Sequence, residues 1–241
     1  MDRAIVIENL SKKYKNHRGI QDINLEINKG EIFGFLGPNG SGKTTTMKIM
    51  VGLMKPDTGD VFINGYSISN EYEKAMRNVG SIIENVVPFS YLTAYENMKL
   101  KSRFYNNVND EDIDRCLYIT GILKFKNEKI KNFSLGMKQR LGIAMAILSN
   151  PSVVILDEPF NGLDIEGMVA MRKLINQMAE EYKITFFISS HLIHDIELTC
   201  TSVGIIHGGR LLVTNSKESI LRNYSSLENY YLSEVDLNGN S

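Results

Sequence analysis

The stretch Gly37-Pro38-Asn39-Gly40-Ser41-Gly42-Lys43-Thr44 matches the pattern G-x-x-x-x-G-K-[ST] without a mismatch. The apolar run Ile32–Leu36 precedes it and a helical segment from Thr44 to about Met50 follows it, which predicts a buried strand, a tight turn and a helix. Glycines in the turn let backbone N–H groups converge on an anion that also faces the positive end of the helix. The stretch therefore predicts a phosphate-binding loop, in which Lys43 contacts the β- and γ-phosphates and the Thr44 hydroxyl binds Mg²⁺.

A glycine-rich turn that carries a lysine by chance is the alternative explanation of this stretch. At the usual glycine frequency, a match somewhere in a chain of 241 residues is expected in about one case in a hundred. The strand before the loop and the helix after it also agree with a phosphate site. We therefore predict that the chain binds a nucleoside triphosphate.

Apolar patterns on both sides of this loop indicate alternating strands and helices. The first thirty residues alternate apolar and polar positions as short strands do, and Val203–His207 and Leu211–Thr214 predict a hairpin around Gly208-Gly209. Further strands are predicted over 61–63, 79–84, 153–156 and 184–188. A helix is predicted where apolar residues recur from Met168 to Tyr182.

Residues 88–150 differ from the rest of the chain because helical patterns dominate there. Thr93 and Glu96 form a capping box, and Gly121 is a C-cap candidate. The sequence predicts one domain over residues 1–241. Its parts are a nucleotide-binding core with a β-subdomain over 1–87 and 151–215, a helical subdomain over 88–150, and a tail over 216–241 whose last ten or so residues fray.

Composition and charge restrict the classes of function. Lys plus Arg number 27 and Asp plus Glu number 28, so the formal charge of −1 gives no electrostatic reason to expect nucleic acid as a partner. Cys116 and Cys200 are too few for a disulfide framework and are interpreted as reduced cytosolic thiols. No run reaches the roughly 18 apolar residues that span a bilayer, and the N-terminus has no signal-peptide pattern. We therefore expect a soluble cytosolic chain.

A second motif distinguishes between the classes of P-loop protein. Val153-Val154-Ile155-Leu156-Asp157-Glu158-Pro159 is an apolar strand that ends in two carboxylates, which is the Walker B pattern. Asp157 is predicted to hold Mg²⁺, and Glu158 is predicted to polarise the attacking water as the general base. A solvated acidic turn is the alternative, and the upstream phosphate loop argues against it.

The stretch Asn132-Phe133-Ser134-Leu135-Gly136-Met137-Lys138-Gln139-Arg140 precedes the Walker B strand. With the two motifs above, it resembles the ATP-binding cassette (ABC) ATPases, whose signature here is usually Leu-Ser-Gly-Gly-Gln. Ser134 and Gly136 match that signature, whereas Leu135 and Met137 depart from it. The resemblance covers nearly the whole chain. It implies an α/β fold: a P-loop NTPase (RecA-like) core with a mainly parallel sheet, an N-terminal antiparallel β-subdomain and an inserted α-helical subdomain.

Further residues match other motifs of the family. Asp164, in Asn161-Gly162-Leu163-Asp164, resembles the D-loop at the dimer interface, and His191 resembles the switch histidine that contacts the γ-phosphate. Tyr14 resembles the aromatic residue that stacks on adenine, although a strand-edge tyrosine packed on the core is the alternative. The resemblance thus implies nucleotide contacts from Tyr14, Gly37, Pro38, Asn39, Gly40, Ser41, Gly42, Lys43, Thr44, Thr45, Ser134, Gly136 and Asp164.

Glu84 stands where the family usually places a glutamine that contacts the metal and the attacking water. A glutamate there adds a negative charge, which tightens metal binding and adds repulsion toward the γ-phosphate. We therefore assign Glu84 to the catalytic set with Glu158 and His191, and to the metal ligands with Thr44 and Asp157. With Glu84, the variant signature and the stretch Tyr91-Leu92-Thr93-Ala94-Tyr95-Glu96-Asn97, the chain is similar to the bacitracin- and lantibiotic-resistance branch of the family. A tolerated near-isostere in a general drug or ion exporter is the alternative.

The resemblance implies partners as well as a reaction. Two cassettes would pack head to tail around two ATP molecules, as a homodimer, with Ser134 and Gly136 acting in trans. ATP and Mg²⁺ are the implied cofactors, and ATP hydrolysis would power a separate integral membrane subunit that clears a peptide antibiotic. The chain would then lie on the inner face of the cell membrane. A non-transport ATP-gated clamp and a small-molecule P-loop kinase are the alternatives. The clamp conflicts with the charge balance, and the kinase leaves His191 and the signature unexplained.

Overall fold

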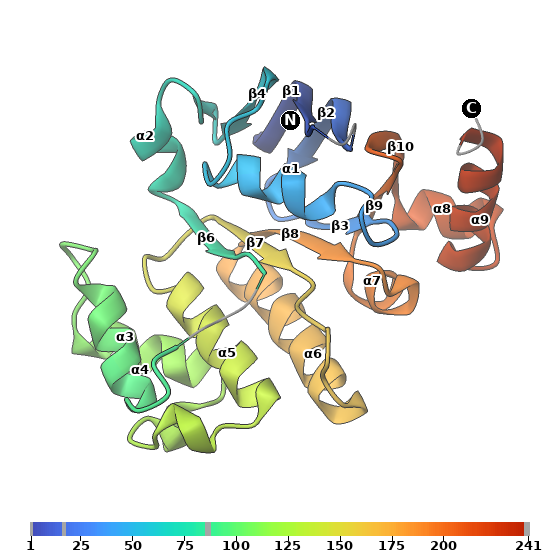
Figure 1. The fold of residues 1–241 in the computed structure, drawn as a ribbon. Helices are drawn as coiled ribbons and strands as arrows, with labels where there is room; N and C mark the ends of the chain where they lie inside the picture. Colours follow the sequence, from blue (N-terminus) through green and yellow to red (C-terminus); the bar gives the residue numbers. More distant parts are fainter. Residues whose placement is uncertain (1, 16–17, 85–87, 239–241) are drawn as a thin grey trace.

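The computed structural model describes residues 2–15, 18–84 and 88–238, and their elements form two sheets with helices packed against them (Figure 1). The smaller sheet is antiparallel throughout, with the strand order β2-β1-β4-β5. Its strands are β1 (Arg3–Lys13), β2 (Gly19–Asn28), β4 (Thr58–Ile63) and β5 (Tyr66–Ser67). This sheet is the antiparallel β-subdomain expected from the sequence.

The larger sheet has the strand order β10-β9-β3-β8-β7-β6. Its strands are β3 (Ile32–Leu36), β6 (Val79–Ile82), β7 (Val153–Asp157), β8 (Thr185–Ser190), β9 (Ser202–His207) and β10 (Arg210–Ser216). All neighbours pair in parallel except β9 and β10, which form the predicted antiparallel hairpin. Every residue of β3, β7 and β8 is buried, as expected for parallel strands covered on both faces.

The two faces of the larger sheet carry separate hydrophobic clusters because side chains alternate along each strand. On one face, Phe33 and Phe35 pack with Phe187, with the helix α1 (Lys43–Met50) and with the smaller sheet. On the other face, Ile32 and Leu36 pack with the remaining long helices. Figure 1 shows α1 on the upper side of this sheet and α3 to α6 on the lower side.

The helical face begins with the predicted insertion. It contains α3 (Ala94–Ser102), α4 (Asp110–Ile119), the short 3₁₀ turns Leu123–Phe125 and Ile130–Asn132, and α5 (Leu135–Ala146). The capping box predicted at Thr93 and Glu96 is confirmed, since each residue bonds the other's backbone. The α6 helix (Ile165–Tyr182) and the α7 helix (Ile193–Thr199) complete this layer. A Cβ at Gly34 would lie 2.6 Å from Ile196 Cγ2, so glycine allows α7 to approach β3 closely.

Two predictions about element ends are wrong. The strand expected over 79–84 ends at Ile82, because Glu84 adopts a left-handed backbone with φ of 66°. The prediction that the last ten or so residues fray is also wrong as far as residue 238, the last one that the structure describes. The chain instead forms α8 (Lys217–Asn223) and α9 (Leu227–Asn238), whose buried Leu227 and Tyr230 join the core. A hydrogen bond of 2.6 Å from Asn215 Nδ2 to the Tyr230 hydroxyl also holds α9.

The remaining helix, α2 (Tyr72–Met76), lies beside the smaller sheet. Over the described ranges, none of the helices has the length and apolar character that crossing a membrane requires.

Candidate active site

The carboxyl ends of three neighbouring parallel strands bring the predicted motifs together. The phosphate loop follows β3, Asp157 ends β7, and Ser189 and Ser190 end β8. Because parallel strands all end at the same edge of a sheet, residues far apart in the sequence meet there. The loop is tied to β8 by a hydrogen bond of 3.4 Å from Gly37 N–H to the Ser190 carbonyl oxygen.

The phosphate loop has the backbone that its sequence predicts. Gly40 and Gly42 have φ of 81° and 111°, and a Cβ on Gly42 would lie only 2.4 Å from Ile20 Cγ2. The hydroxyl of Ser41 is buried and makes no hydrogen bond within the described part of the chain. A buried hydroxyl without a partner is costly, so this loop is suited to a polar ligand that would satisfy it.

Lys43 folds back over this loop. Its Nζ donates hydrogen bonds to the carbonyl oxygens of Gly37, at 2.8 Å, and Pro38, at 3.2 Å. It also lies 3.4 Å from Glu158 Oε1, and the lysine side chain is almost completely buried. A buried ammonium needs an anionic partner, and Glu158 provides that charge.

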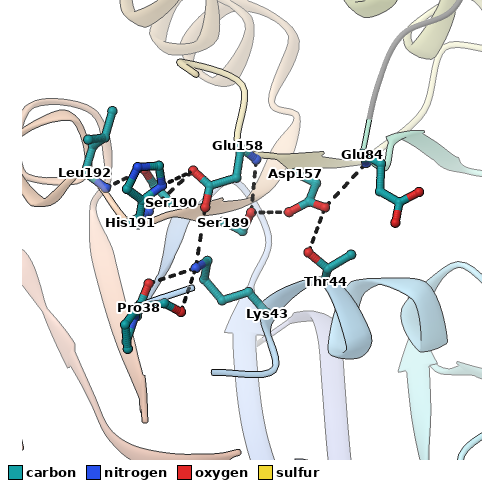
Figure 2. A network of polar contacts seen from close by, with 11 residues as sticks. Pro38, Lys43, Thr44, Glu84, Asp157, Glu158, Ser189, Ser190, His191 and Leu192 are labelled. Carbon is teal, nitrogen blue, oxygen red and sulfur yellow. Dashed lines mark hydrogen bonds and ion pairs between the residues drawn. The ribbon is translucent and has the colours of Figure 1, made fainter. Parts of the chain in front are cut away.

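Glu158 lies between Lys43 and His191 (Figure 2). Its Oε2 is 2.9 Å from His191 Nδ1, while the His191 backbone N–H donates to the same oxygen at 3.4 Å. Glu158 has a left-handed backbone with φ of 49°, and its N–H donates to Ser189 Oγ at 3.0 Å. A non-glycine residue in this conformation stores strain and is typical of functional sites.

Asp157 is buried and accepts three hydrogen bonds from the described residues. Thr44 Oγ1 donates to Oδ2 at 3.0 Å, Ser189 Oγ donates to Oδ1 at 2.6 Å, and the Glu84 N–H donates to Oδ2 at 3.4 Å. Hydroxyl and carboxylate oxygens are the ligands that Mg²⁺ prefers. The pair Thr44 and Asp157 therefore fits the predicted metal contact.

Among the contacts of the described residues, Glu84 reaches this network only through its backbone N–H. Its carboxylate lies 2.5 Å from Lys48 Nζ on α1, and Figure 2 shows it directed away from Asp157. In this structure the carboxylate therefore does not make the metal-site contact expected from the sequence.

Tyr14 lies at the rim of a cavity of about 450 Å³ beside the phosphate loop. Its hydroxyl is 3.3 Å from Thr45 Oγ1 and donates to Met54 Sδ at 3.2 Å, and the side chain is partly exposed. The other residues that line this cavity are Arg18, Gly19, Asn39, Gly40, Gly42, Lys43, Thr44, Thr45 and Glu158. The cavity thus joins a phosphate loop to an aromatic ring.

Comparisons with known proteins agree with this arrangement. A family model described as ABC transporter matches residues 20–161. The chain belongs to this family. It is 42% identical over 212 residues to the bacitracin transport ATP-binding protein of Bacillus licheniformis, covering 88% of this chain and 69% of that protein. It is 37% identical over 207 residues to a lantibiotic transport ATP-binding protein of Streptococcus pyogenes, covering 86% and 88%.

A solved structure of an ATP-binding subunit of an ABC transporter has the same fold as this chain. It has a TM-score of 0.82 and 29% identity, and the match covers 96% of this chain and 99% of the other. The predicted fold class and the assignment as an ABC ATPase subunit that binds ATP are confirmed. Another solved structure, 26% identical with a TM-score of 0.82 and covering 99% of this chain and 96% of the other, is cbiO1 of Clostridium perfringens, described as part of an ABC transporter complex.

The signature and D-loop of this ABC ATPase lie apart from the network around Lys43. Ser134 caps α5 by accepting a hydrogen bond of 3.2 Å from the Met137 N–H, and Asp164 caps α6 through the Gly167 N–H at 2.8 Å. The two helix starts are neighbours, because a Cβ on Gly162 would lie 3.0 Å from Leu135 Cδ2. Figure 1 shows the beginnings of both helices on the lower side of the sheet, opposite α1. Within one chain, Ser134, Gly136 and Asp164 therefore do not join the phosphate loop.

Two residues of this site, Ser189 and Lys48, were not predicted from the sequence. Ser189 bridges Asp157 and the Glu158 backbone, and Lys48 holds the Glu84 carboxylate. A polar residue at the end of the apolar strand 184–188 was the available signal for Ser189. Lys48 stands four residues after Thr44, hence on the same side of α1, which was the available signal for its position.

Proposed function

We propose that this chain uses ATP to power a membrane subunit that removes a peptide antibiotic from the cell membrane. The observation that carries the proposal is the convergence of Lys43, Glu158 and His191 at the carboxyl edge of the larger sheet. The phosphate loop supplies binding, and the other two residues supply hydrolysis. We also propose that residues 88–150 act as the helical subdomain of this machine.

Binding begins at the cavity beside the phosphate loop. Tyr14 would stack on adenine, and the glycine-rich backbone and the Ser41 hydroxyl would face phosphate oxygens. Lys43 would exchange Glu158 and two carbonyl oxygens for the β- and γ-phosphates. This exchange keeps a negative partner beside the buried ammonium before and after binding.

Hydrolysis would follow with Glu158 as general base. Once Lys43 turns to the phosphates, the Glu158 carboxylate is free to accept a proton from water, and His191 remains beside it to contact the γ-phosphate. Thr44 and Asp157 would hold Mg²⁺, which supplies neutralisation of charge on the phosphate oxygens when it is bound. Ser189 keeps Asp157 and the Glu158 backbone in position.

A second copy of the chain would complete each site. Ser134, Gly136 and Asp164 lie at two adjacent helix starts, whose exposed N–H groups suit the γ-phosphate bound to a partner cassette. We propose a homodimer that closes on ATP, attached to an integral membrane subunit on the cytoplasmic side of the membrane. Closure is driven by contacts that exist only in the ATP-bound dimer.

The substrate class is proposed from the relatives and from Glu84. Two relatives are described as bacitracin and lantibiotic transport ATP-binding proteins, so a membrane-active peptide antibiotic is the substrate class that we favour. Export of a general drug or ion remains the alternative.

The test is a resistance assay with the chain and its membrane partner expressed together. Bacitracin, a lantibiotic and a non-peptide drug are compared as minimum inhibitory concentrations, with the Lys43→Met variant as the inactive control. We expect protection against at least one peptide that the variant abolishes, and no protection against the non-peptide drug. Protection against the non-peptide drug alone would overturn the substrate class, and equal protection by the variant would overturn the ATP requirement.

A further inference from the structure

The ion pair between Lys48 and Glu84 lies next to the proposed metal site. Lys48 stands one helical turn after Thr44 on α1, so both side chains are on the same side of that helix. The Glu84 N–H contacts Asp157 Oδ2 at 3.4 Å, while the Glu84 carboxylate contacts Lys48 Nζ at 2.5 Å. The Glu84 backbone therefore lies at the proposed metal site, whereas Lys48 holds the Glu84 carboxylate beside that site.

The position of the carboxylate has an electrostatic reason. Among the described residues, the hydrogen-bond donors to the Asp157 carboxylate are Thr44, Ser189 and the Glu84 N–H, and none of them brings a positive charge to it. A second carboxylate placed beside it would be repelled. Lys48 offers the opposite charge one helical turn after Thr44 and pairs with the Glu84 carboxylate, which Figure 2 shows directed away from Asp157.

Only the side chain of Glu84 has to move for its charge to reach the metal site. The left-handed backbone at Glu84, with φ of 66°, is costly for a non-glycine residue and is fixed at Asp157 by the N–H. The side chain is more than half exposed and meets Lys48 alone among the described charged groups. Rotation about its side-chain bonds is fast compared with enzymatic turnover.

We propose that Lys48 is a positioning residue for Glu84. It holds the carboxylate away from Thr44 and Asp157 until a divalent cation arrives with the nucleotide, and the cation then competes with Lys48 for the carboxylate. A glutamine at position 84 has no charge for Lys48 to hold, so this competition depends on the glutamate. The inference rests on the proposed function, because it takes Thr44 and Asp157 as metal ligands.

The test is a double-mutant cycle with Lys48→Met and Glu84→Gln. Mn²⁺ replaces Mg²⁺, and its binding to the full chain with ADP is measured by electron paramagnetic resonance. We expect Lys48→Met to tighten Mn²⁺ binding by about threefold more when Glu84 is present than when it is combined with Glu84→Gln. Lys48→Arg should restore the wild-type affinity, since it keeps the charge. The metal concentration for half-maximal ATP turnover should change in the same direction while kcat changes less.

Control variants separate this inference from simpler effects. Lys74→Met removes the exposed ion pair between Lys74 on α2 and Glu71, which precedes this helix, and should leave Mn²⁺ binding unchanged. An equal shift by Lys48→Met with and without Glu84→Gln would mean that Lys48 acts by its charge alone and would overturn the inference. The inference would also be overturned if Lys48→Met, with Glu84 kept, bound Mn²⁺ with the wild-type affinity. If wild-type protein bound ADP but bound no Mn²⁺ when Mn²⁺ was present, that result would instead contradict the metal site of the proposed function.

Discussion

The contact between Lys43 and Glu158 predicts that removal of one negative charge strengthens nucleotide binding. Glu158 Oε1 lies 3.4 Å from the buried Lys43 ammonium. ATP must replace this partner, so the ion pair competes with the phosphates. Glu158→Gln removes the competing charge, keeps nearly the same shape, and also removes the general base.

The size of the effect follows from the geometry. Two unit charges 3.4 Å apart attract each other by about 5 kcal/mol at an effective dielectric constant of 20. Glu158 is partly exposed and also contacts His191, so only about 1–2 kcal/mol of this attraction opposes ATP. We therefore expect Glu158→Gln to bind the nucleotide about 5- to 30-fold more tightly than wild type.

Isothermal titration calorimetry with a non-hydrolysable ATP analogue measures this affinity. ATP turnover should fall by about 10²- to 10⁴-fold, and the variant should accumulate as an ATP-bound dimer in size-exclusion chromatography. Glu180→Gln, at an exposed position on α6, is the matched control and should bind as wild type does. Equal or weaker binding of the analogue by Glu158→Gln would refute the competition between Glu158 and phosphate, and wild-type turnover would refute its role as base.

Three further predictions test the scaffold of the site. Asp195→Ala should lower the free energy of unfolding in urea by about 1–3 kcal/mol, because it removes the buried partner of the half-buried Arg172 on α6, whose guanidinium lies 2.5 Å from Asp195 Oδ1. Arg222→Ala, in an exposed pair, should cost about 1 kcal/mol or less. Ser189→Ala should lower ATP turnover by about 10- to 100-fold with the fold retained in circular dichroism, and unchanged turnover would remove it from the site. Burial raises the pKa of the Cys116 thiol to about 11 and raises the pKa of the Cys200 thiol further, so both thiols stay protonated at pH 8. Both buried cysteines should therefore react with a thiol reagent only after the protein unfolds. Rapid labelling of the native protein would contradict their burial.

Much of the fold could be predicted from the sequence because its patterns are local. The run Ile32–Leu36 is uniformly apolar and ends in a glycine-rich turn, so the bounds of β3 and α1 were predicted within about one residue. The C-terminal helices α8 and α9 were not predicted. They depend on tertiary contacts, such as the hydrogen bond between Asn215 and Tyr230, and such contacts override a weak local pattern.

The candidate site could likewise be predicted from the sequence only in part. Lys43, Asp157, Glu158 and His191 each follow or end a predicted parallel strand, so their meeting at one edge of the sheet could be expected. The direction of the Glu84 carboxylate could not be expected, because it depends on the charges around it. The contacts of Lys48 and Ser189 likewise need the distances between α1, β7 and β8, which the sequence does not contain.

The larger sheet separates two hydrophobic clusters, and this division bears on how the chain opens in its native state. Local opening of α3 to α5 would expose side chains of the cluster on the helical face to water. The sheet would still shield the other cluster, which packs against α1, from water. Partial opening of this kind is measured by native-state hydrogen exchange. Amides of β3, β7 and β8, which contribute to both clusters, should exchange slowest, and those of α3 should exchange faster. We therefore expect α3 to α5 to open locally while the phosphate loop stays folded.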